Sequence, residues 1–395
     1  MRATKAYILL GVAVILATAS LFIVVPAPIY FLWLVSLLAT ELAPQIVLVS
    51  MILLWLAYRY WRLGLPRRVC CAAALLAIFS LIVGVSLAVN IFGFAASKKE
   101  SLSLLDCLIF KRPQTKGIVK YKGKQYARRD SGALYLDIYQ SQQTQQAEQT
   151  IPAAAAAAAA AAVGRPAIIV IHGGSWRGGH RSDFEQYDFW LAGLGYTVFD
   201  LDYRLVKSGV HFPSPEKDIE LAFDWIAAHA TELGVDTRRI AVLGRSAGAQ
   251  LAMVMAYKAA LSGDSRVRCV VDLYGPTDLA WDYDNPIQPD VIDCRDVLEA
   301  YLGGSPTQLP ELYSQGSACA LVGDATPPTL FIHGGHDQIV SDRNVDRLLP
   351  HLREHKIASD YLFMPWANHG YDWNFSGFSS QLARNSIERF LKKHL

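Results

Sequence analysis

One serine in this sequence has the surroundings of a nucleophile. Ser246 lies at the centre of Gly244–Gly248, with the sequence GRSAG, directly after the apolar run 239–243 and before a segment rich in Ala, Met and Leu at helical spacing, 247–261. A sharp strand–turn–helix junction of this kind exposes the serine hydroxyl and requires small flanking residues. The helix N-terminus favours negative charge developing beside the hydroxyl. The bare pattern also arises by chance, so the serine's partners must decide.

A serine hydroxyl needs a base to take its proton and a third group to orient that base. His369 follows the last predicted strand, and Asp337 follows the strand before it. The chain order Ser246, Asp337, His369 is the order expected when a G-x-S-x-G turn lies in a parallel sheet flanked by helices. We therefore predict Ser246 as nucleophile, His369 as general base and general acid, and Asp337 as the orienting carboxylate. The alternatives are a structural role for His369 and Asp342 as the acid.

Backbone amides near Ser246 are candidates to stabilise an oxyanion. The N–H of Ala247 directly follows the nucleophile, and Gly173 and Gly174 follow an earlier buried strand, where the lack of side chains lets amides turn toward a substrate. The N–H of Ser175 is an additional candidate. Trp176, at the end of the same loop, is either a core residue or a wall of the pocket.

Strand-like and helix-like segments alternate in the second part of the chain. This alternation predicts an α/β fold with a mostly parallel sheet, whose working groups lie at the carboxyl ends of the strands. The first two strands alternate like strands at an exposed edge. The expected strands are 117–121, 134–139, 167–171, 196–201, 239–243, 268–274, 329–332 and 360–364, and the expected helices include 218–229, 247–261 and 379–391.

The first 95 residues have the composition of a membrane unit. Three apolar stretches, 7–25, 43–60 and 69–92, are long enough to span a bilayer, whereas 29–40 is short and is a loop, a re-entrant piece or an extension of its neighbour. Basic residues occur before the first span and between the second and third spans. With three spans, both groups lie on the same side of the membrane, which is the cytoplasmic side. The sequence thus predicts a multi-pass membrane protein with its catalytic domain on the extracytoplasmic side. A cleaved signal peptide is the alternative for the first span.

The remaining chain divides by composition. We expect a membrane anchor at 1–95, for which a sensing or partner-binding role is left open. Residues 96–116 are expected to be a juxtamembrane linker, either an ordinary connector or a segment that lies partly on the bilayer surface. The catalytic domain is expected at 117–395. That domain contains a low-complexity insertion at 140–163 and a cap-like insertion at 276–328 that shapes the substrate pocket. Cys294 and Cys319 both lie in the second insertion and could form a disulfide, which an exported domain permits.

Several classes of function find no support in the sequence. The net charge is +2, and no basic stripe with interleaved aromatic residues indicates nucleic-acid binding. No cofactor or metal is predicted. The glycine pair at 303–304 lacks the lysine of a phosphate-binding loop. The acidic cluster in the second insertion lacks a histidine and a metal-ligand spacing, so this cluster is expected to be solvated. The acidic cluster comprises Asp278, Asp282, Asp284, Asp290 and Asp293.

Five segments together resemble the α/β-hydrolase esterases over about 119–395. The likeness is greatest to the carboxylesterase, feruloyl-esterase and kynurenine-formamidase-like branch. The hormone-sensitive-lipase branch is similar, but it usually has a third glycine where this chain has Ser175 and an aspartate where it has Arg245. The resemblance implies the α/β-hydrolase fold and ester hydrolysis through an acyl-enzyme without a cofactor. The segments are His172–Trp176, Asp202–Leu205, Gly244–Gly248, His333–Asp337 and Asn368–Gly370.

These observations predict a membrane-anchored serine esterase that cleaves carboxylic esters of small or lipid-like molecules. A serine amidase or peptidase of the same fold is an alternative, because the same three side chains serve both reactions. A binding or signalling protein on a hydrolase scaffold is a further alternative, which the presence of all three side chains disfavours.

Overall fold

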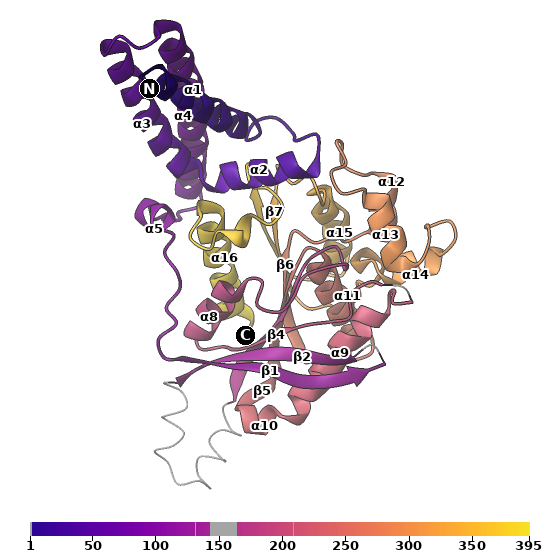
Figure 1. The fold of residues 1–395 in the computed structure, drawn as a ribbon. Coiled ribbons are helices and arrows are strands. Elements are labelled where there is room, and N and C mark those ends of the chain that lie inside the picture. Colours follow the sequence, from indigo (N-terminus) through magenta and orange to yellow (C-terminus); the bar gives the residue numbers. More distant parts are fainter. Residues whose placement is uncertain (1, 131, 143–163, 208) are drawn as a thin grey trace.

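A single mixed sheet organises the larger part of the molecule (Figure 1). The computed structural model describes residues 2–130, 132–142, 164–207 and 209–395. Within these residues the strands follow the order β1-β2-β4-β3-β5-β6-β7-β8, antiparallel from β1 to β4 and parallel from β4 to β8. The strands are β1 (Ile118–Arg129), β2 (Gly132–Ser141), β3 (Arg165–Ile171), β4 (Thr197–Leu201), β5 (Val235–Arg245), β6 (Val267–Leu273), β7 (Thr329–Gly334) and β8 (Ser359–Met364).

Helices cover both faces of this sheet and make it a buried layer. In β3, Ile169 and Ile171 pack toward one helical layer, while Ile168 and Val170 pack toward the other. This two-sided burial explains the continuous apolar run of the central strands. The first layer contains α9 (Ser214–Ala228), α11 (Ala247–Leu261) and α15 (Arg343–Glu354), and the second contains α8 (Glu185–Gly193) and α16 (Phe378–His394); the short α10 (Ala230–Leu233) precedes β5. The predicted α/β class is confirmed.

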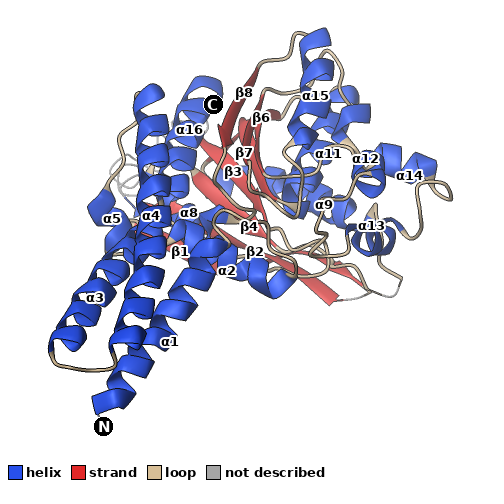
Figure 2. Ribbon diagram, turned by 90° about the horizontal axis from the view of Figure 1, so that it is seen from above, coloured by secondary structure: helices blue, strands red, loops and turns tan. Residues whose placement is uncertain are grey.

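The N-terminal helices form a bundle that projects from one side of the sheet (Figure 2). Within the described residues, α1 (Arg2–Leu21), α3 (Ala43–Arg62) and α4 (Arg67–Ser97) are long and apolar enough to cross a membrane, by length and composition. Helix α4 continues five residues past the predicted third span. The short segment left open above is a helix of its own, α2 (Tyr30–Glu41), which lies across the others and against the sheet domain (Figure 1).

The predicted linker at 96–116 is fastened to its neighbours. It contains the short helix α5 (Leu104–Leu108), in which Cys107 is buried. The Cys107 carbonyl accepts a hydrogen bond from Gln45 of α3 at 3.0 Å. The Ser103 backbone N–H donates to the Gln381 side chain of α16 at 2.7 Å, and that side chain donates back to the Ser103 carbonyl at 3.1 Å. The segment thus ties the bundle to the last helix of the sheet domain.

The insertion at 276–328 folds into short helices beside α11 and α15. They are α12 (Leu279–Asp284), α13 (Cys294–Leu302), α14 (Pro310–Gln315) and the 3₁₀ turn η1 (Ala318–Ala320). Cys294 and Cys319 are free thiols, so the suggested disulfide is absent. The acidic cluster, which was expected to be solvated, is solvated only in part. Asp282 is 7% exposed and accepts a hydrogen bond from Asn344, while Asp278 and Asp293 cap α12 and α13.

Two predictions for the first strands need correction. Of these two strands, β1 lies at an edge of the sheet, whereas β2 is flanked by β1 and β4, and its residues Leu136 and Ile138 are fully buried. Gln140 belongs to the end of β2 rather than to the low-complexity insertion, and its side chain donates to the Leu233 carbonyl at 2.9 Å. The rest of that predicted insertion, residues 143–163, lies outside the described residues.

Candidate active site

Ser246 occupies a tight turn between β5 and α11. Its backbone has φ 53° and ψ −123°, a conformation that non-glycine residues adopt at a cost of about 1–3 kcal/mol. A Cβ on Gly244 would lie 2.3 Å from the Gly248 carbonyl oxygen, and a Cβ on Gly248 would lie 2.3 Å from the carbonyl oxygens of Ile171 and His172. The two glycines therefore let helix and strands approach closely enough to form the turn, which holds the serine side chain out of the sheet.

His369 and Asp337 lie beside this serine and form a continuous hydrogen-bonded chain with it. The His369 Nε2 atom is 2.8 Å from the Ser246 Oγ atom, and its Nδ1 atom is 2.7 Å from the Asp337 Oδ2 atom. His369 and Asp337 are 7% and 8% exposed, so little water competes for these contacts. The rival carboxylate, Asp342, is the N-cap residue of α15, and Asp337 takes the position beside the imidazole.

The Asp337 carboxylate is held in its charged form. Burial raises its pKa, but the adjoining His369 and His333 outweigh this effect and hold the pKa of Asp337 well below its usual range. The Oδ1 atom accepts hydrogen bonds from the backbone N–H groups of Ile339 at 2.8 Å and Val340 at 2.9 Å. With Oδ1 fixed in this way, Oδ2 faces the imidazole of His369. The carboxylate is thereby oriented to accept a hydrogen bond from the Nδ1–H group of His369.

The loop after β3 folds tightly against the serine turn. Gly174, Ser175 and Trp176 have φ values of 113°, 52° and 56°, three successive residues in the left-handed region. A Cβ on Gly173 would lie 3.1 Å from the Ser246 Cβ atom, and one on Gly174 would lie 2.4 Å from the Gly178 carbonyl oxygen. Only glycine fits these two positions, so the backbone of the loop can approach the serine closely.

The third predicted oxyanion donor, the N–H of Ala247, belongs to the first residue of α11. The N–H of a first helical residue has no acceptor within its own helix and carries the positive end of the helix dipole. The start of the helix therefore places this N–H beside Ser246, while Gly173 and Gly174 belong to the facing loop.

His172 and Trp176 brace the loop through aromatic stacking. The His172 ring stacks on Tyr203 with centroids 4.3 Å apart, and the Trp176 ring stacks on Tyr301 of α13 at 4.0 Å. The Trp176 indole N–H donates to the Gln250 side chain at 3.0 Å. Trp176 is buried and also lines the cavity beside Ser246, so it is both a core residue and a wall of the pocket.

A small cavity adjoins Ser246. Its volume is about 30 Å³, which is room for about one water molecule. Ser175 and Trp176 form one side of the cavity. The insertion at 276–328 and the segment after Asp337 supply mostly apolar residues on the other side. The remaining lining residues are Ser246, Ala247, Pro276, Asp282, Ile292, Cys294, Val297, Leu298, Ile339 and Val340. The insertion thus contributes to the pocket.

Sequence reasoning missed a buried ion pair behind the serine. Arg245 is 1% exposed, and its Nε atom is 2.6 Å from the Oδ2 atom of the fully buried Asp372. The Tyr274 hydroxyl donates to the other carboxylate oxygen, and the Tyr274 ring lies 4.5 Å from the His369 ring. The presence of arginine in the G-x-S-x-G motif was the available signal, but no local pattern pointed to Asp372.

Comparisons with known proteins relate the chain to esterases. The BD-FAE family model matches residues 156–352. Esterase LipC of Mycobacterium tuberculosis is 29% identical over 220 residues, which cover 52% of this chain and 53% of that protein. Carboxylesterase NlhH of the same species is 30% identical over 190 residues, covering 45% and 58%. The chain has the α/β-hydrolase fold, and the relatives that it resembles in sequence are named esterases. It spans about half the length of these curated relatives.

Solved structures support the fold of this α/β-hydrolase. A fungal esterase from Rhizomucor miehei superposes with a TM-score of 0.59 at 20% identity, over 77% of this chain and 96% of the esterase. At this identity the likeness shows the fold alone, and the chemistry of the site must be argued from its own residues.

Proposed function

We propose that this chain is a membrane-associated serine hydrolase that cleaves carboxylic esters through an acyl-enzyme on Ser246. The observation that carries the proposal is the hydrogen-bonded chain from the Ser246 hydroxyl through His369 to Asp337, with contacts of 2.8 Å and 2.7 Å. Such a chain supplies a nucleophile, a base and an orienting charge in one place. The similarity to proteins named esterase and carboxylesterase supports the same activity.

The reaction proceeds in two steps. His369 Nε2 takes the proton of the Ser246 hydroxyl while Oγ attacks the ester carbonyl carbon, and Asp337 stabilises the resulting imidazolium. His369 then donates this proton to the departing alkoxide, so that an alcohol leaves and the acyl group stays on Ser246. In the second step His369 takes a proton from water, hydroxide attacks the acyl carbon, and His369 returns the proton to Ser246 as the acid leaves.

The tetrahedral intermediates of both steps place negative charge on the former carbonyl oxygen. We propose that the N–H groups of Ala247, Gly173 and Gly174 stabilise this oxyanion. The close approach of the glycine loop to Ser246 and the position of Ala247 at the start of α11 support these donors.

The bundle at residues 1–95 is proposed to anchor the catalytic domain, residues 117–395, on the extracytoplasmic side. The chain begins at the same end of the bundle as the loop that joins α3 to α4 (Figure 1). Four arginines lie at or near this loop, and two of them pack over tryptophan rings: Arg59 over Trp55, and Arg67 over Trp61. Basic residues with interfacial tryptophans are typical of a cytoplasmic membrane boundary. An alkaline phosphatase fusion at the C-terminus should be active, and an inactive fusion would contradict this orientation.

The activity is tested with the full-length chain in detergent and p-nitrophenyl acetate as substrate. Ser246→Ala should lower kcat by about 10⁴-fold or more, because the nucleophile is lost. Wild-type turnover that survives in this variant would reject the proposal. A matched p-nitroanilide substrate measures the preference for ester over amide in the same preparation.

A further inference from the structure

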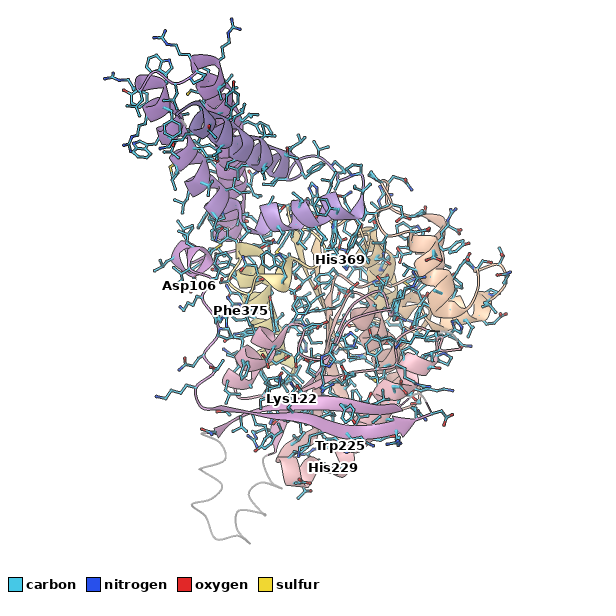
Figure 3. All side chains as sticks on the ribbon, viewed as in Figure 1. Asp106, Lys122, Trp225, His229, His369 and Phe375 are labelled. Carbon is cyan, nitrogen blue, oxygen red and sulfur yellow. The ribbon has the colours of Figure 1, made fainter. Side chains whose placement is uncertain are left out.

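Helix α2 and the turn before it lie over the carboxyl edge of the sheet, above His369 (Figures 1 and 3). The Gln338 side chain holds the turn through both polar atoms. Its Oε1 accepts from the Ala27 backbone N–H at 2.8 Å, and its Nε2 donates to the Ala27 carbonyl at 3.0 Å. Because Gln338 directly follows Asp337, the membrane unit is joined to the loop that carries the carboxylate.

The loop that carries His369 is joined to α2 in the same way. The Asn368 side chain donates to the Ser36 hydroxyl at 3.2 Å and lies 3.3 Å from the Thr40 hydroxyl. At the end of α2, Glu41 accepts a hydrogen bond from Ser379 of α16 at 2.7 Å. These contacts are buried, so α2 is a fixed roof over the site.

The contact between this roof and the pocket is apolar. Trp33 and Leu37 of α2 form a buried cluster with Val291, and Ile292 and Ile339 pack against it. The last two residues also line the cavity beside Ser246. The inner face of α2 is therefore continuous with the apolar wall of the pocket.

The outer face of α2 is apolar as well. Tyr30, Phe31 and Leu38 are 49%, 67% and 44% exposed. Helix α3 begins immediately after α2 and has 20 residues, so it extends about 30 Å, the thickness of the hydrocarbon core. Because its arginines lie at the far end, the near boundary of the bilayer falls at the level of α2. A helix at that level buries its outer apolar face in the membrane interface.

A mostly apolar groove lies between the bundle at this level and the segments that precede Asp337 and His369. It has a volume of about 490 Å³ and runs between Ile23 and Val24, which follow α1, and Leu87 and Phe94 of α4. Trp366, three residues before His369, closes it on the side of the sheet domain. A groove of this size and composition suits a lipid chain.

We propose that the substrate is a membrane-resident amphiphile whose ester group reaches Ser246 from the bilayer, beneath α2. The inference rests on the proposed hydrolase function. Because the cavity beside Ser246 has a volume of only about 30 Å³, the acyl group is proposed to be short, as in an acetate ester, while the long apolar part of the substrate stays against α2 and the bilayer.

The test compares two acetate esters with the full-length chain reconstituted into phosphatidylcholine vesicles. One is water-soluble p-nitrophenyl acetate, and the other is 1-O-hexadecyl-2-acetylglycerol mixed into the vesicles, with release of acetate as the readout. Phe31→Glu places a charge on the outer face of α2 and should lower the ratio of lipid-ester to soluble-ester kcat/KM at least about tenfold. The matched control is Leu261→Glu, the same kind of change at a 55% exposed residue of α11, which should leave the ratio unchanged.

A second measurement uses only the wild-type protein and does not depend on a variant folding. At constant bulk concentration of the lipid ester, added pure phosphatidylcholine should slow its hydrolysis in proportion to the surface dilution. Three outcomes would overturn the inference but not the hydrolase function. They are hydrolysis of the soluble ester with no activity on the lipid ester, a kcat/KM ratio that is unchanged in Phe31→Glu, and a rate of lipid-ester hydrolysis that does not change with surface dilution. Failure on both esters would reject the hydrolase function and the inference with it.

Discussion

Replacing Asp337 with asparagine should leave the site assembled but hold His369 in the wrong tautomer. The Oδ1 atom of Asp337 accepts two backbone N–H groups, from Ile339 and Val340. An amide NH₂ at that position would face two donors, so the asparagine must place its carbonyl oxygen there and its NH₂ toward His369. The imidazole Nδ1 atom must then accept, and the proton resides on Nε2, which faces Ser246.

A protonated Nε2 cannot take the serine proton. A carboxylate-to-amide change at this position in a serine triad costs about 10⁴-fold in kcat, or about 5.4 kcal/mol of transition-state free energy. We expect a loss of this size for Asp337→Asn, measured as kcat for p-nitrophenyl acetate with the full-length chain in detergent. Asp342→Asn is the matched control and should keep wild-type kcat, because Asp342 is the N-cap residue of α15 and is not hydrogen-bonded to His369 within the described residues.

A loss smaller than about tenfold in Asp337→Asn would refute this reasoning. It would mean that the tautomer of His369 is set by another group or that His369 is not the base. Equal losses in Asp337→Asn and Asp342→Asn would instead indicate a general effect of the substitutions on the loop.

Two further predictions concern stability, each measured as the free energy of unfolding of the full-length chain in detergent by urea titration. Arg245→Met leaves the Asp372 carboxylate buried without its cationic partner and should lower the free energy of unfolding by about 3–5 kcal/mol. Adding Asp372→Asn to the same chain should restore much of this loss. A free energy of unfolding that is unchanged in Arg245→Met would contradict the ion-pair assignment. Burial raises the pKa of Asp282 to about 7, so the folded state keeps a proton that the unfolded chain releases near pH 4, and stability falls as pH rises between these values. Asp282→Asn should therefore be more stable than wild type at pH 8, by up to about 4 kcal/mol, and the difference in the free energy of unfolding should be smaller at pH 5. An equal difference at both pH values would contradict the raised pKa of Asp282.

The fold class was predictable because its signals are local. The continuous apolar runs of β3 and β5 indicate strands buried on both faces, and the glycines around Ser246 indicate a tight turn. The ends of parallel strands meet at one edge, so Asp337 and His369 were expected near Ser246. In the structure His369 lies within hydrogen-bond distance of Ser246, and Asp337 lies within hydrogen-bond distance of His369.

Long-range packing set the features that could not be predicted. The ion pair of Arg245 joins residues 127 positions apart, and the contact of Ala27 with Gln338 joins residues 311 apart. Helix α2 is too short for a span and too apolar for an ordinary surface helix, so its sequence alone left it undecided. Its place is fixed by loops at the other end of the chain. In the same way, the covering of β2 by β1 depends on pairing rather than on the alternation within either strand.

The most direct test of the account is to identify the residue that carries the acyl group. The full-length chain is treated with a fluorophosphonate that mimics the tetrahedral intermediate, digested, and examined by peptide mass spectrometry. We predict one adduct, on Ser246, that blocks hydrolysis of p-nitrophenyl acetate in proportion to its occupancy and fails to form in His369→Ala. An adduct on another residue, or full hydrolysis with Ser246 modified, would contradict the central claim.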